Sequence, residues 1–226
     1  MSLINPSSLL ESLKAQDLHV YKEIFEENVY CVAPQELQDK GLLDIGGHYG
    51  MFTIYGVIAG TKQTITVEAN QSNLIKCLNN TKDTNVKVIN AAVSSQKDAI
   101  LNINNEGGCS TLSTGEQLVA TITLETLIKQ FDSNLPLVLK MDIEGAEYDI
   151  LYNTDPENIK RFSLILMEAH NHNPTERGNE AEKLKEYILS LGFNIGFLGI
   201  YFTDAFPDLS DKTYIPYAYS YKFIKN

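Results

Sequence analysis

Residues 42–50 read Leu-Leu-Asp-Ile-Gly-Gly-His-Tyr-Gly, an apolar strand that runs into a glycine-rich turn. An acidic residue, Asp44, closes the strand, and Gly46 and Gly50 flank the turn. Because glycine has no Cβ, such a turn can bend sharply and lets a bulky ligand approach the main chain. The segment therefore predicts a ligand site at the carboxyl end of a strand.

A second strand, predicted at 64–68, ends in Glu68, which lies 24 residues after Asp44. A carboxylate in this place can accept both hydroxyls of a ribose, as in nucleotide-binding βαβ units. The dinucleotide fingerprint Gly-x-Gly-x-x-Gly would need glycines at 46, 48 and 51, where the chain has Gly46, His48 and Met51. The pattern thus predicts a nucleoside-containing ligand without the dinucleotide signature.

Hydrophobic periodicity predicts strands and helices that alternate along the chain. The main strands are expected at 41–46, 64–68, 86–93, 135–141, 162–167, 193–202 and 214–224, with short extra strands at 99–104 and 118–121. Helices are expected at 8–20, 50–58, 71–80, 123–131, 144–152 and 179–191. This alternation indicates an α/β fold with a mostly parallel seven-stranded sheet, helices on both faces and an antiparallel C-terminal strand pair. We expect one domain over 1–226, with an N-terminal helical segment (1–40), a cofactor-binding core (41–170) and a C-terminal helix and strand pair (171–226).

The composition is that of a globular protein, with 43% hydrophobic and 21% charged residues. The net charge of −11 and the lack of a basic run argue against a nucleic-acid partner, which would need clustered Lys and Arg. No apolar stretch is long enough to span a membrane, and the N-terminus does not read as a signal peptide. Three widely spaced cysteines fit a reducing compartment, so the expected location is cytoplasmic.

The segment Leu-Lys-Met-Asp-Ile-Glu-Gly-Ala-Glu at 139–147 places three charged residues at two-residue intervals where a central strand ends. On a strand, that spacing directs Lys140, Asp142 and Glu144 to one side. Asp142 ends a buried central strand, which is where substrates of α/β proteins bind. Lys140 interrupts an apolar run and should have a carboxylate partner. Glu147 has two readings of equal weight, a functional group or a complement to the helix dipole.

A third segment, Met-Glu-Ala-His at 167–170, follows the strand expected beside that of Asp142. His170 is a candidate general base, because an imidazole of ordinary pKa titrates near neutral pH. Asp142, Glu168 and His170 also suit a divalent cation, although their spacing is not specific to one metal. A metal is therefore left open and is not part of the expected site. His172, two residues further on, is expected to be solvated.

These motifs together resemble the FkbM-type methyltransferases. The resemblance covers about 41–170 and consists of Asp-Ile-Gly-Gly-His-Tyr-Gly, Val-Glu-Ala-Asn, Gly-Cys-Ser, Thr-Leu-Glu-Thr-Leu, Lys-Met-Asp-Ile-Glu-Gly-Ala-Glu and Met-Glu-Ala-His, in that order. It implies a Rossmann-like class I methyltransferase that uses S-adenosylmethionine and methylates a hydroxyl, often of a sugar or a polyketide-type product. The family usually has Gly-Ala-Asn where this chain has Gly46-Gly47-His48, and often Glu-Pro where it has Glu68-Ala69.

The resemblance also implies roles for individual residues. The methionine side of the cofactor would be shaped by the turn residues Asp44, Gly46, Gly47, His48, Tyr49 and Gly50. Glu68 would accept the ribose hydroxyls. The rest of the adenosine site and its neighbouring loop would comprise Ala69, Asn70, Asn90, Ala91, Ala92 and Ser110.

The expected reaction is O-methylation, most readily of a sugar or glycan, because carboxylates accept hydrogen bonds from sugar hydroxyls. His170 is the first candidate base and Asp142 the second, with Lys140 and Glu144 orienting Asp142 or binding acceptor hydroxyls. Tyr214, Tyr217, Tyr219 and Tyr221 offer a stacking surface or pack in the sheet. Two alternatives are a nicotinamide-dependent sugar oxidoreductase or epimerase, and a nucleotide-binding module without catalysis. The missing Gly-x-Gly-x-x-Gly counts against the first, and the intact acidic residues count against the second.

Overall fold

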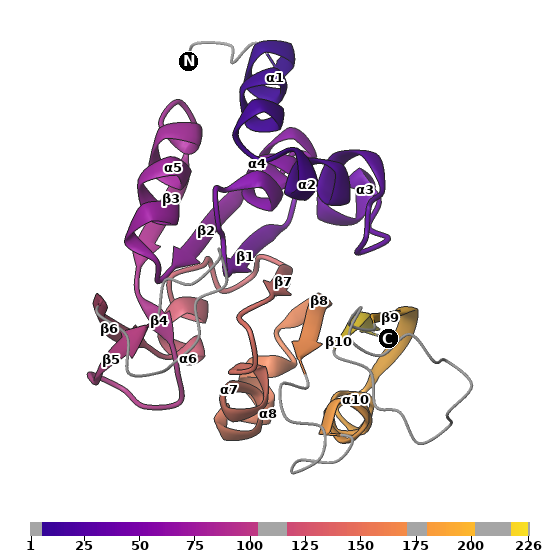
Figure 1. Ribbon diagram of the computed structural model, residues 1–226. Helices are drawn as coiled ribbons and strands as arrows, with labels where there is room; N and C mark the ends of the chain where they lie inside the picture. The colour runs from indigo at the N-terminus through magenta and orange to yellow at the C-terminus, as the bar shows by residue number, and fades with distance from the viewer. Residues whose placement is uncertain (1–5, 104–116, 171–179, 202–217, 226) are drawn as a thin grey trace, which may run out of the picture.

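The computed structural model describes residues 6–103, 117–170, 180–201 and 218–225, and Figure 1 shows their arrangement. A seven-stranded sheet has the order β3-β2-β1-β7-β8-β10-β9. Its strands are β1 (Gly41–Ile45), β2 (Gln63–Glu68), β3 (Val86–Asn90), β7 (Leu137–Met141), β8 (Phe162–His170), β9 (Phe193–Tyr201) and β10 (Ala218–Lys225). β10 is antiparallel to both neighbours, and the pairs among β3, β2, β1, β7 and β8 are parallel. The expected mostly parallel sheet with an antiparallel C-terminal strand pair is confirmed.

Helices cover both faces of the sheet. The N-terminal layer comprises α1 (Pro6–Gln16), α2 (Leu18–Tyr21), the π-helix η1 (Lys22–Glu26), α3 (Pro34–Leu37), α4 (Met51–Ile58) and, beside α4, α5 (Gln71–Thr81). The opposite layer comprises α6 (Leu124–Ile128), α7 (Glu147–Asn153), α8 (Pro156–Ile159) and α10 (Glu180–Ser190). None of the helices in the described ranges is both long and apolar enough to cross a bilayer.

The two-residue period of the strands decides which layer each side chain meets. Leu42 and Val138 belong to the core under the N-terminal layer, whereas Leu43 and Leu139 belong to the opposite core. Asp44 follows Leu42 by two residues and Lys140 follows Val138 by two, and these two residues are register partners in the β1–β7 pair. The polar ends of these strands therefore face the N-terminal layer.

Two strand predictions need correction. The strand expected at 86–93 is split, because the chain leaves the main sheet after Asn90 and β4 (Ala92–Val93) joins a separate sheet. This three-stranded sheet has the order β4-β6-β5, with β5 (Ile100–Ile103) and β6 (Gln117–Ile122). Asn90 accounts for the break, since its side-chain amide donates to the carbonyls of Glu68 and Ala69 at the end of β2. β8 runs three residues further than expected and includes His170.

Two helix boundaries also differ. The helix expected from Glu144 begins at Glu147, because Glu144 and Gly145 have left-handed φ angles of 58° and 104°, which a helix cannot contain. The helix expected at 8–20 begins earlier, at Pro6, and is broken at Asp17. The Asp17 side chain accepts hydrogen bonds from the His19 and Val20 amides, so it starts a new helix there.

Candidate active site

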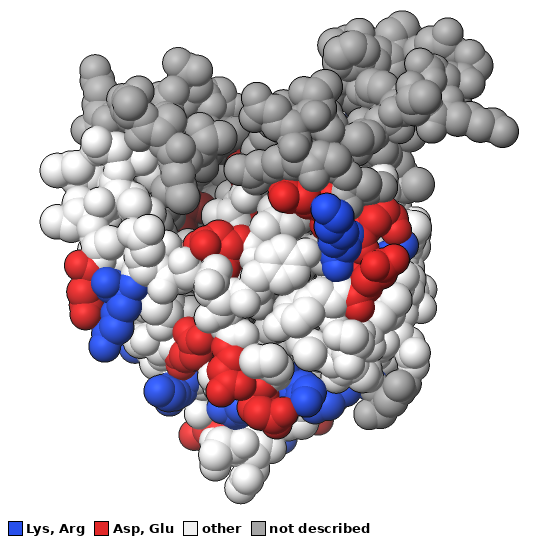
Figure 2. Space-filling model, turned by 90° about the horizontal axis from the view of Figure 1, so that it is seen from below, with Lys and Arg blue, Asp and Glu red and all other residues white. Residues whose placement is uncertain are grey.

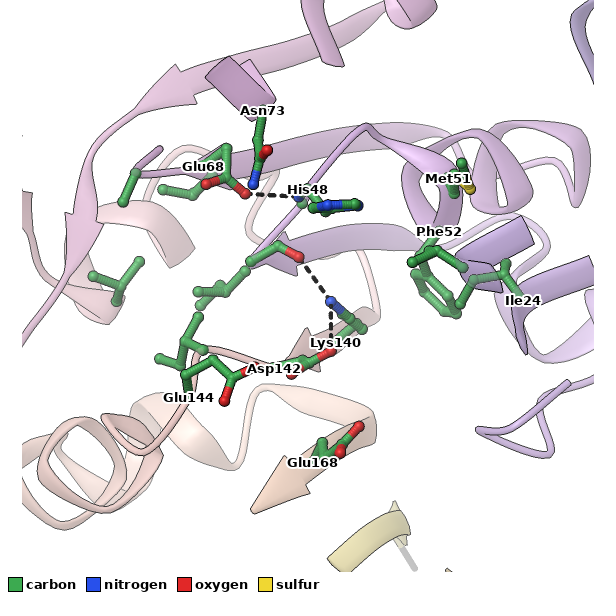
Figure 3. A pocket seen from close by; sticks show the side chains of 18 of the residues that line it. Ile24, His48, Met51, Phe52, Glu68, Asn73, Lys140, Asp142, Glu144 and Glu168 are labelled. Atoms are coloured by element: carbon green, nitrogen blue, oxygen red, sulfur yellow. Dashed lines mark hydrogen bonds and ion pairs between the residues drawn. The ribbon is translucent and has the colours of Figure 1, made fainter. Parts of the chain in front are cut away.

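A cavity of about 560 Å³ opens at the carboxyl ends of β1, β2, β7 and β8. In Figure 3, Glu68 and Glu168 lie on opposite sides of the cavity, with Lys140 and Asp142 between them. Its lining also includes Ala91 beyond β3 and residues of the N-terminal layer. The carboxyl ends of parallel strands thus form the site, as in other open α/β sheets.

The glycine turn after β1 closes tightly against the neighbouring strand. Gly46 has a φ of 78°, and a Cβ there would lie 1.9 Å from the carbonyl oxygen of Asp142. A Cβ on Gly47 would lie 2.2 Å from Oγ1 of Thr66. His48 has a φ of 50°, in the left-handed region where Asn and His are enriched among non-glycine residues. The turn therefore requires glycine at 46 and 47 in order to pack against its neighbours, and Gly46, Gly47 and His48 line the cavity.

Glu68 ends β2 and is 6% exposed. Its two oxygens accept hydrogen bonds from the main-chain amides of His48 and Asn70, each at 2.7 Å. Burial raises its pKa to about 7, although both amides favour the ionised form. A carboxylate oxygen has more than one acceptor position, so Glu68 can still accept ribose hydroxyls.

Asp44 is fully buried and does not line the cavity. Its Oδ2 accepts a hydrogen bond from the Thr53 hydroxyl at 2.6 Å, and its Oδ1 lies 3.6 Å from Nζ of Lys140. Burial raises the pKa of Asp44 in spite of the positive charge of Lys140. Asp44 can therefore act on a ligand only through Lys140 and the shape of the turn.

The structure places the other expected cofactor residues in two groups. Cavity-lining residues are Gly46, Gly47, His48, Glu68, Ala69, Ala91 and Ala92. Tyr49, Gly50 and Asn70 do not line it: Tyr49 stacks on the His48 ring at 3.9 Å, Gly50 is the residue before α4, and Asn70 caps α5. Asn73, one turn into α5, lines the cavity instead. Ser110, His172, Tyr214 and Tyr217 lie outside the described residues.

Lys140 is 5% exposed and donates a hydrogen bond to the carbonyl oxygen of Gly46 at 2.8 Å. Its Nζ also lies 3.6 Å from a carboxylate oxygen of Asp142 (Figure 3) and 3.6 Å from one of Asp44. Burial favours the neutral amine, but the charges of Asp142 and Asp44 outweigh it and raise the pKa of Lys140. The expected carboxylate partner of Lys140 is confirmed, and its charge ties the glycine turn to the end of β7.

Asp142 receives a second partner that the sequence did not predict. The hydroxyl of Tyr30, which is 4% exposed, donates to Oδ2 of Asp142 at 3.1 Å. Burial opposes ionisation of Asp142, but the charges of Lys140 and His170 hold its pKa below the ordinary value. Asp142 is therefore an ionised hydrogen-bond acceptor at neutral pH.

His170 is 3% exposed and surrounded by carboxylates. Its Nδ1 lies 3.1 Å from Oε1 of Glu147, and its Nε2 lies 3.5 Å from Glu168 and 3.6 Å from Glu144. Burial favours the neutral ring, but the hydrogen bond and the charge of Glu147 outweigh it and raise the pKa of His170 to about 10. The ordinary pKa expected for His170 is therefore wrong. The imidazole is protonated at neutral pH and cannot take up another proton.

Glu168, unlike His170, has a pKa near neutral pH. Burial and the charge of Asp142 raise it to about 7, while His170 and Lys140 favour the ionised form. Asp142, Glu168 and His170 each offer one donor atom within 4.8 Å of the others, close enough to hold a cation between them. A cation would need the neutral imidazole of His170, so a metal and a proton would compete for its ring nitrogen.

The cavity also contains residues that sequence patterns did not identify. Its lining includes residues of the N-terminal layer, among them Glu23, Ile24, Tyr30 and Phe52. None belongs to a motif, and each reaches the site only because the N-terminal layer packs over the polar ends of β1, β7 and β8. Tyr219 and Tyr221 lie in β10 and are buried in the core, so these two pack in the sheet.

Several solved structures resemble the fold at low sequence identity. One is an S-adenosylmethionine-dependent methyltransferase from Mesorhizobium loti, with 10% identity, a TM-score of 0.48 and coverage of 87% of this chain and 100% of that one. Another is a precorrin-6y C5,15-methyltransferase from Geobacter metallireducens, with 16% identity, a TM-score of 0.47 and coverage of 91% and 92%. A third is TrmK of M. capricolum in complex with S-adenosylhomocysteine, with 15% identity, a TM-score of 0.46 and coverage of 85% and 66%.

Among curated proteins, none matches the chain. The model of the FkbM methyltransferase domain matches residues 44–195, which include the glycine turn, Glu68, the Lys140–Glu147 segment and His170. The match spans well over half of the chain and favours methyl transfer over nicotinamide chemistry. The chain therefore belongs to the FkbM family of S-adenosylmethionine-dependent methyltransferases.

Proposed function

We propose that the protein methylates a hydroxyl group of a sugar or glycan. The observation that carries this proposal is the pair formed by Glu168, whose pKa is about 7, and the protonated His170 3.5 Å away. A base whose pKa lies near the working pH is largely deprotonated and still has enough affinity for the proton it must accept. Such a base is needed for an alcohol, whose proton must leave as its oxygen is methylated.

The residues around the glycine turn fit the cofactor. S-adenosylmethionine, when bound, supplies an activated methyl group on a sulfonium. Glu68 accepts the ribose hydroxyls, and the main chain at Gly46 and Gly47 lies along the ligand, since both residues line the cavity. Oδ1 of Asp44, which accepts no hydrogen bond from the described residues, holds Lys140 against the Gly46 carbonyl and so fixes the turn. Alignment of donor and acceptor contributes about 7–11 kcal/mol to barrier lowering in well-oriented reactions.

The carboxylates at the ends of β7 and β8 divide the work on the acceptor. Asp142 stays ionised and accepts a hydrogen bond from a neighbouring hydroxyl of the acceptor, which orients the sugar. The proton of the reacting hydroxyl passes to Glu168, which contributes about 10²- to 10⁴-fold to the rate. His170, held in its charged form by Glu147, stabilises the negative charge that develops on the acceptor oxygen. His170 is thus reassigned from base to fixed positive charge.

The charge of the protein supports an uncharged acceptor over a nucleic acid. The net charge is −11, and Glu23, Asp142, Glu144 and Glu168 line the acceptor side of the cavity. On the face in Figure 2, basic and acidic side chains are interspersed, and its described part carries no continuous basic patch. Phosphate groups would be repelled, whereas sugar hydroxyls would find hydrogen-bond acceptors.

The experiment is a methyl-transfer assay with purified protein and S-adenosylmethionine labelled in its methyl group. Uncharged methyl glycosides, short glycans and RNA are offered separately, and mass spectrometry locates the new methyl group. We expect an O-methylated glycoside and no labelled RNA. Labelled RNA, or a methyl group on nitrogen, would contradict the proposal. A parallel reaction with a chelator tests the metal alternative, in which activity would vanish and return with a divalent cation.

A further inference from the structure

We propose that residues 17–30 form the acceptor-binding wall and that Tyr30 positions Asp142 for the reaction. This inference rests on the proposed O-methylation and adds the surface that recognises the sugar. The segment precedes the part of the chain that matches the FkbM domain, 44–195, so the family match assigns it no role. It nevertheless lines the cavity through Val20, Glu23, Ile24, Val29 and Tyr30, among others.

Strand geometry explains why this segment reaches the reacting groups. Asp44 and Lys140 point to the N-terminal layer, because they continue the alternation of Leu42 and Val138. In β8, Glu168 follows Leu166 in the same alternation, and Leu166 belongs to the same core. The chain that covers this face therefore lies directly over the proposed base and its neighbours.

The C-terminal end of the segment is held firmly in place. The hydroxyl of Tyr55 in α4 donates to the carbonyl oxygen of Val32 at 2.9 Å. Nζ of Lys222 in β10 donates to the carbonyl oxygen of Cys31 at 2.8 Å and to Glu36 at 2.7 Å. These bonds link the chain just after Tyr30 to α4 and to β10, so Tyr30 is delivered to Asp142 by a fixed support.

Tyr30 constrains the orientation of Asp142. Its ring packs edge-on against Phe52, with 5.5 Å between centroids, and its hydroxyl bonds Oδ2 of Asp142 at 3.1 Å. Lys140 lies 3.6 Å from the same oxygen, while Oδ1 lies 3.9 Å from Nε2 of His170. With Oδ2 occupied in this way, Oδ1 is the oxygen left for the neighbouring hydroxyl that orients the acceptor. Tyr30 is a positioning residue, because it acts through Asp142.

The chemistry of the wall suits an uncharged sugar ring. Ile24 and Phe52 offer an apolar surface, and Figure 3 shows them next to each other across the cavity from Glu68. Glu23 adds a second carboxylate to the wall. Burial raises the pKa of Glu23, and the nearby charge of Asp142 raises it further. A sugar ring has C–H faces that pack on apolar side chains and hydroxyl edges that donate to carboxylates. An acceptor carrying phosphate would meet Glu23 and Asp142 and be repelled.

The test uses the full chain and the methyl glycoside with the highest turnover in the assay above. Three variants are compared with the wild type: Glu23→Gln, Ile24→Ala and Tyr30→Phe. We expect Glu23→Gln and Ile24→Ala to raise the acceptor KM by about tenfold, the scale of one lost charged hydrogen bond or buried apolar contact. We expect Tyr30→Phe to lower kcat by about tenfold with little change in KM. Calorimetry should give unchanged affinity for S-adenosylhomocysteine in all three.

Matched controls separate recognition from folding. Tyr152→Phe removes the hydroxyl of an exposed tyrosine in α7 that does not line the cavity, and Glu11→Gln removes an exposed carboxylate of the N-terminal layer. Both should keep wild-type kinetics. Saturation-transfer NMR of the glycoside, with S-adenosylhomocysteine bound, should show weaker binding in Glu23→Gln and Ile24→Ala.

Two negative results have different meanings. Unchanged kinetics in all three variants, with a glycoside that the wild type methylates, would overturn this inference and leave the proposed function intact. A kcat loss in Tyr152→Phe equal to that in Tyr30→Phe would also overturn the positioning role. Cofactor binding without methylation of any glycoside would instead overturn the proposed function, and the sugar-binding wall with it.

Discussion

Nδ1 of His170 lies 3.1 Å from Oε1 of Glu147, a carboxylate with no exposed surface. Glu147 is the first residue of α7 and His170 the last of β8, so the contact joins the start of a helix to the end of a strand. The same oxygen also accepts a hydrogen bond from the amide of Ile143 at 3.1 Å. This pair holds His170 in its charged form, and for that reason we propose Glu168 as the proton acceptor.

Glu147→Gln should lower the pKa of His170 from about 10 toward its ordinary value near 6.5. The pKa of folded His170 is raised, so the resulting stabilisation is complete below about pH 6.5 and is lost as pH rises through 10. At pH 7 the variant should lose about 3–5 kcal/mol of unfolding free energy, the usual cost of breaking a buried ion pair. Imidazole NMR titration and urea unfolding measure the two effects. The exposed Glu157→Gln serves as the control, and an unshifted His170 pKa would refute the assignment.

Methyl transfer should increase as pH rises through about 7, because Glu168 must lose its proton before it can act as base. It should fall again near pH 10, where His170 loses its charge. The check is kcat for a methyl glycoside between pH 5.5 and 10.5 in wild type and in Glu168→Gln. The variant should lose about 10²- to 10⁴-fold in rate and its acidic limb. An acidic limb that persists in Glu168→Gln would assign the base to another group.

Glu68→Ala should weaken the binding of S-adenosylhomocysteine, because the ribose hydroxyls lose a buried carboxylate acceptor. Loss of a charged hydrogen bond costs about 1.5–3 kcal/mol, which corresponds to roughly 10- to 150-fold in affinity. Isothermal calorimetry measures the change, with Glu186→Ala on the exposed side of α10 as the control. Equal affinities for Glu68→Ala and wild type would remove Glu68 from the cofactor site.

The affinity for S-adenosylhomocysteine should itself depend on pH. The pKa of Glu68 is about 7, so its carboxylate gains a proton and loses acceptor capacity as pH falls through that value. An unperturbed glutamate would stay ionised between pH 6 and 8 and give constant affinity. We expect calorimetry to show weaker binding at pH 6 than at pH 8 for the wild type. The same comparison should be flat in Glu68→Gln.

Gly47→Ala should destabilise the protein, because the new Cβ would lie 2.2 Å from Oγ1 of Thr66. Overpacking of this kind typically costs about 1–3 kcal/mol. Thr66→Ala removes that oxygen, so the double variant should be more stable than the two single effects predict by addition. Urea unfolding of the four proteins gives the coupling free energy. If the two single changes in unfolding free energy simply add in the double variant, contact with Thr66 is not the reason that position 47 requires glycine.

Much of the fold was predictable from local patterns. The glycine turn, the buried strands 135–141 and 162–167 and the acidic end of β2 were recognisable because apolar runs and turn residues act on their immediate neighbours in the chain. The boundary at Glu144 was missed because its left-handed backbone comes from the turn after β7, not from helix propensity. The break at Asn90 depends on a side chain that bonds a different strand, so strand propensity did not reveal it.

The sequence by itself determined the α/β architecture, the glycine turn after β1 and the gathering of Asp142, Glu168 and His170 at neighbouring strand ends. Only the tertiary structure decided the protonation states and hydrogen-bond partners of those residues. Tyr30 and Asp142 are 112 residues apart, and Glu147 reaches His170 across 23 residues, so neither contact has a sequence signal. Burial and nearby charge set a pKa, and both arise only when the layers close over the sheet. For that reason the base expected at His170 became a fixed charge, and Glu168 became the proposed base.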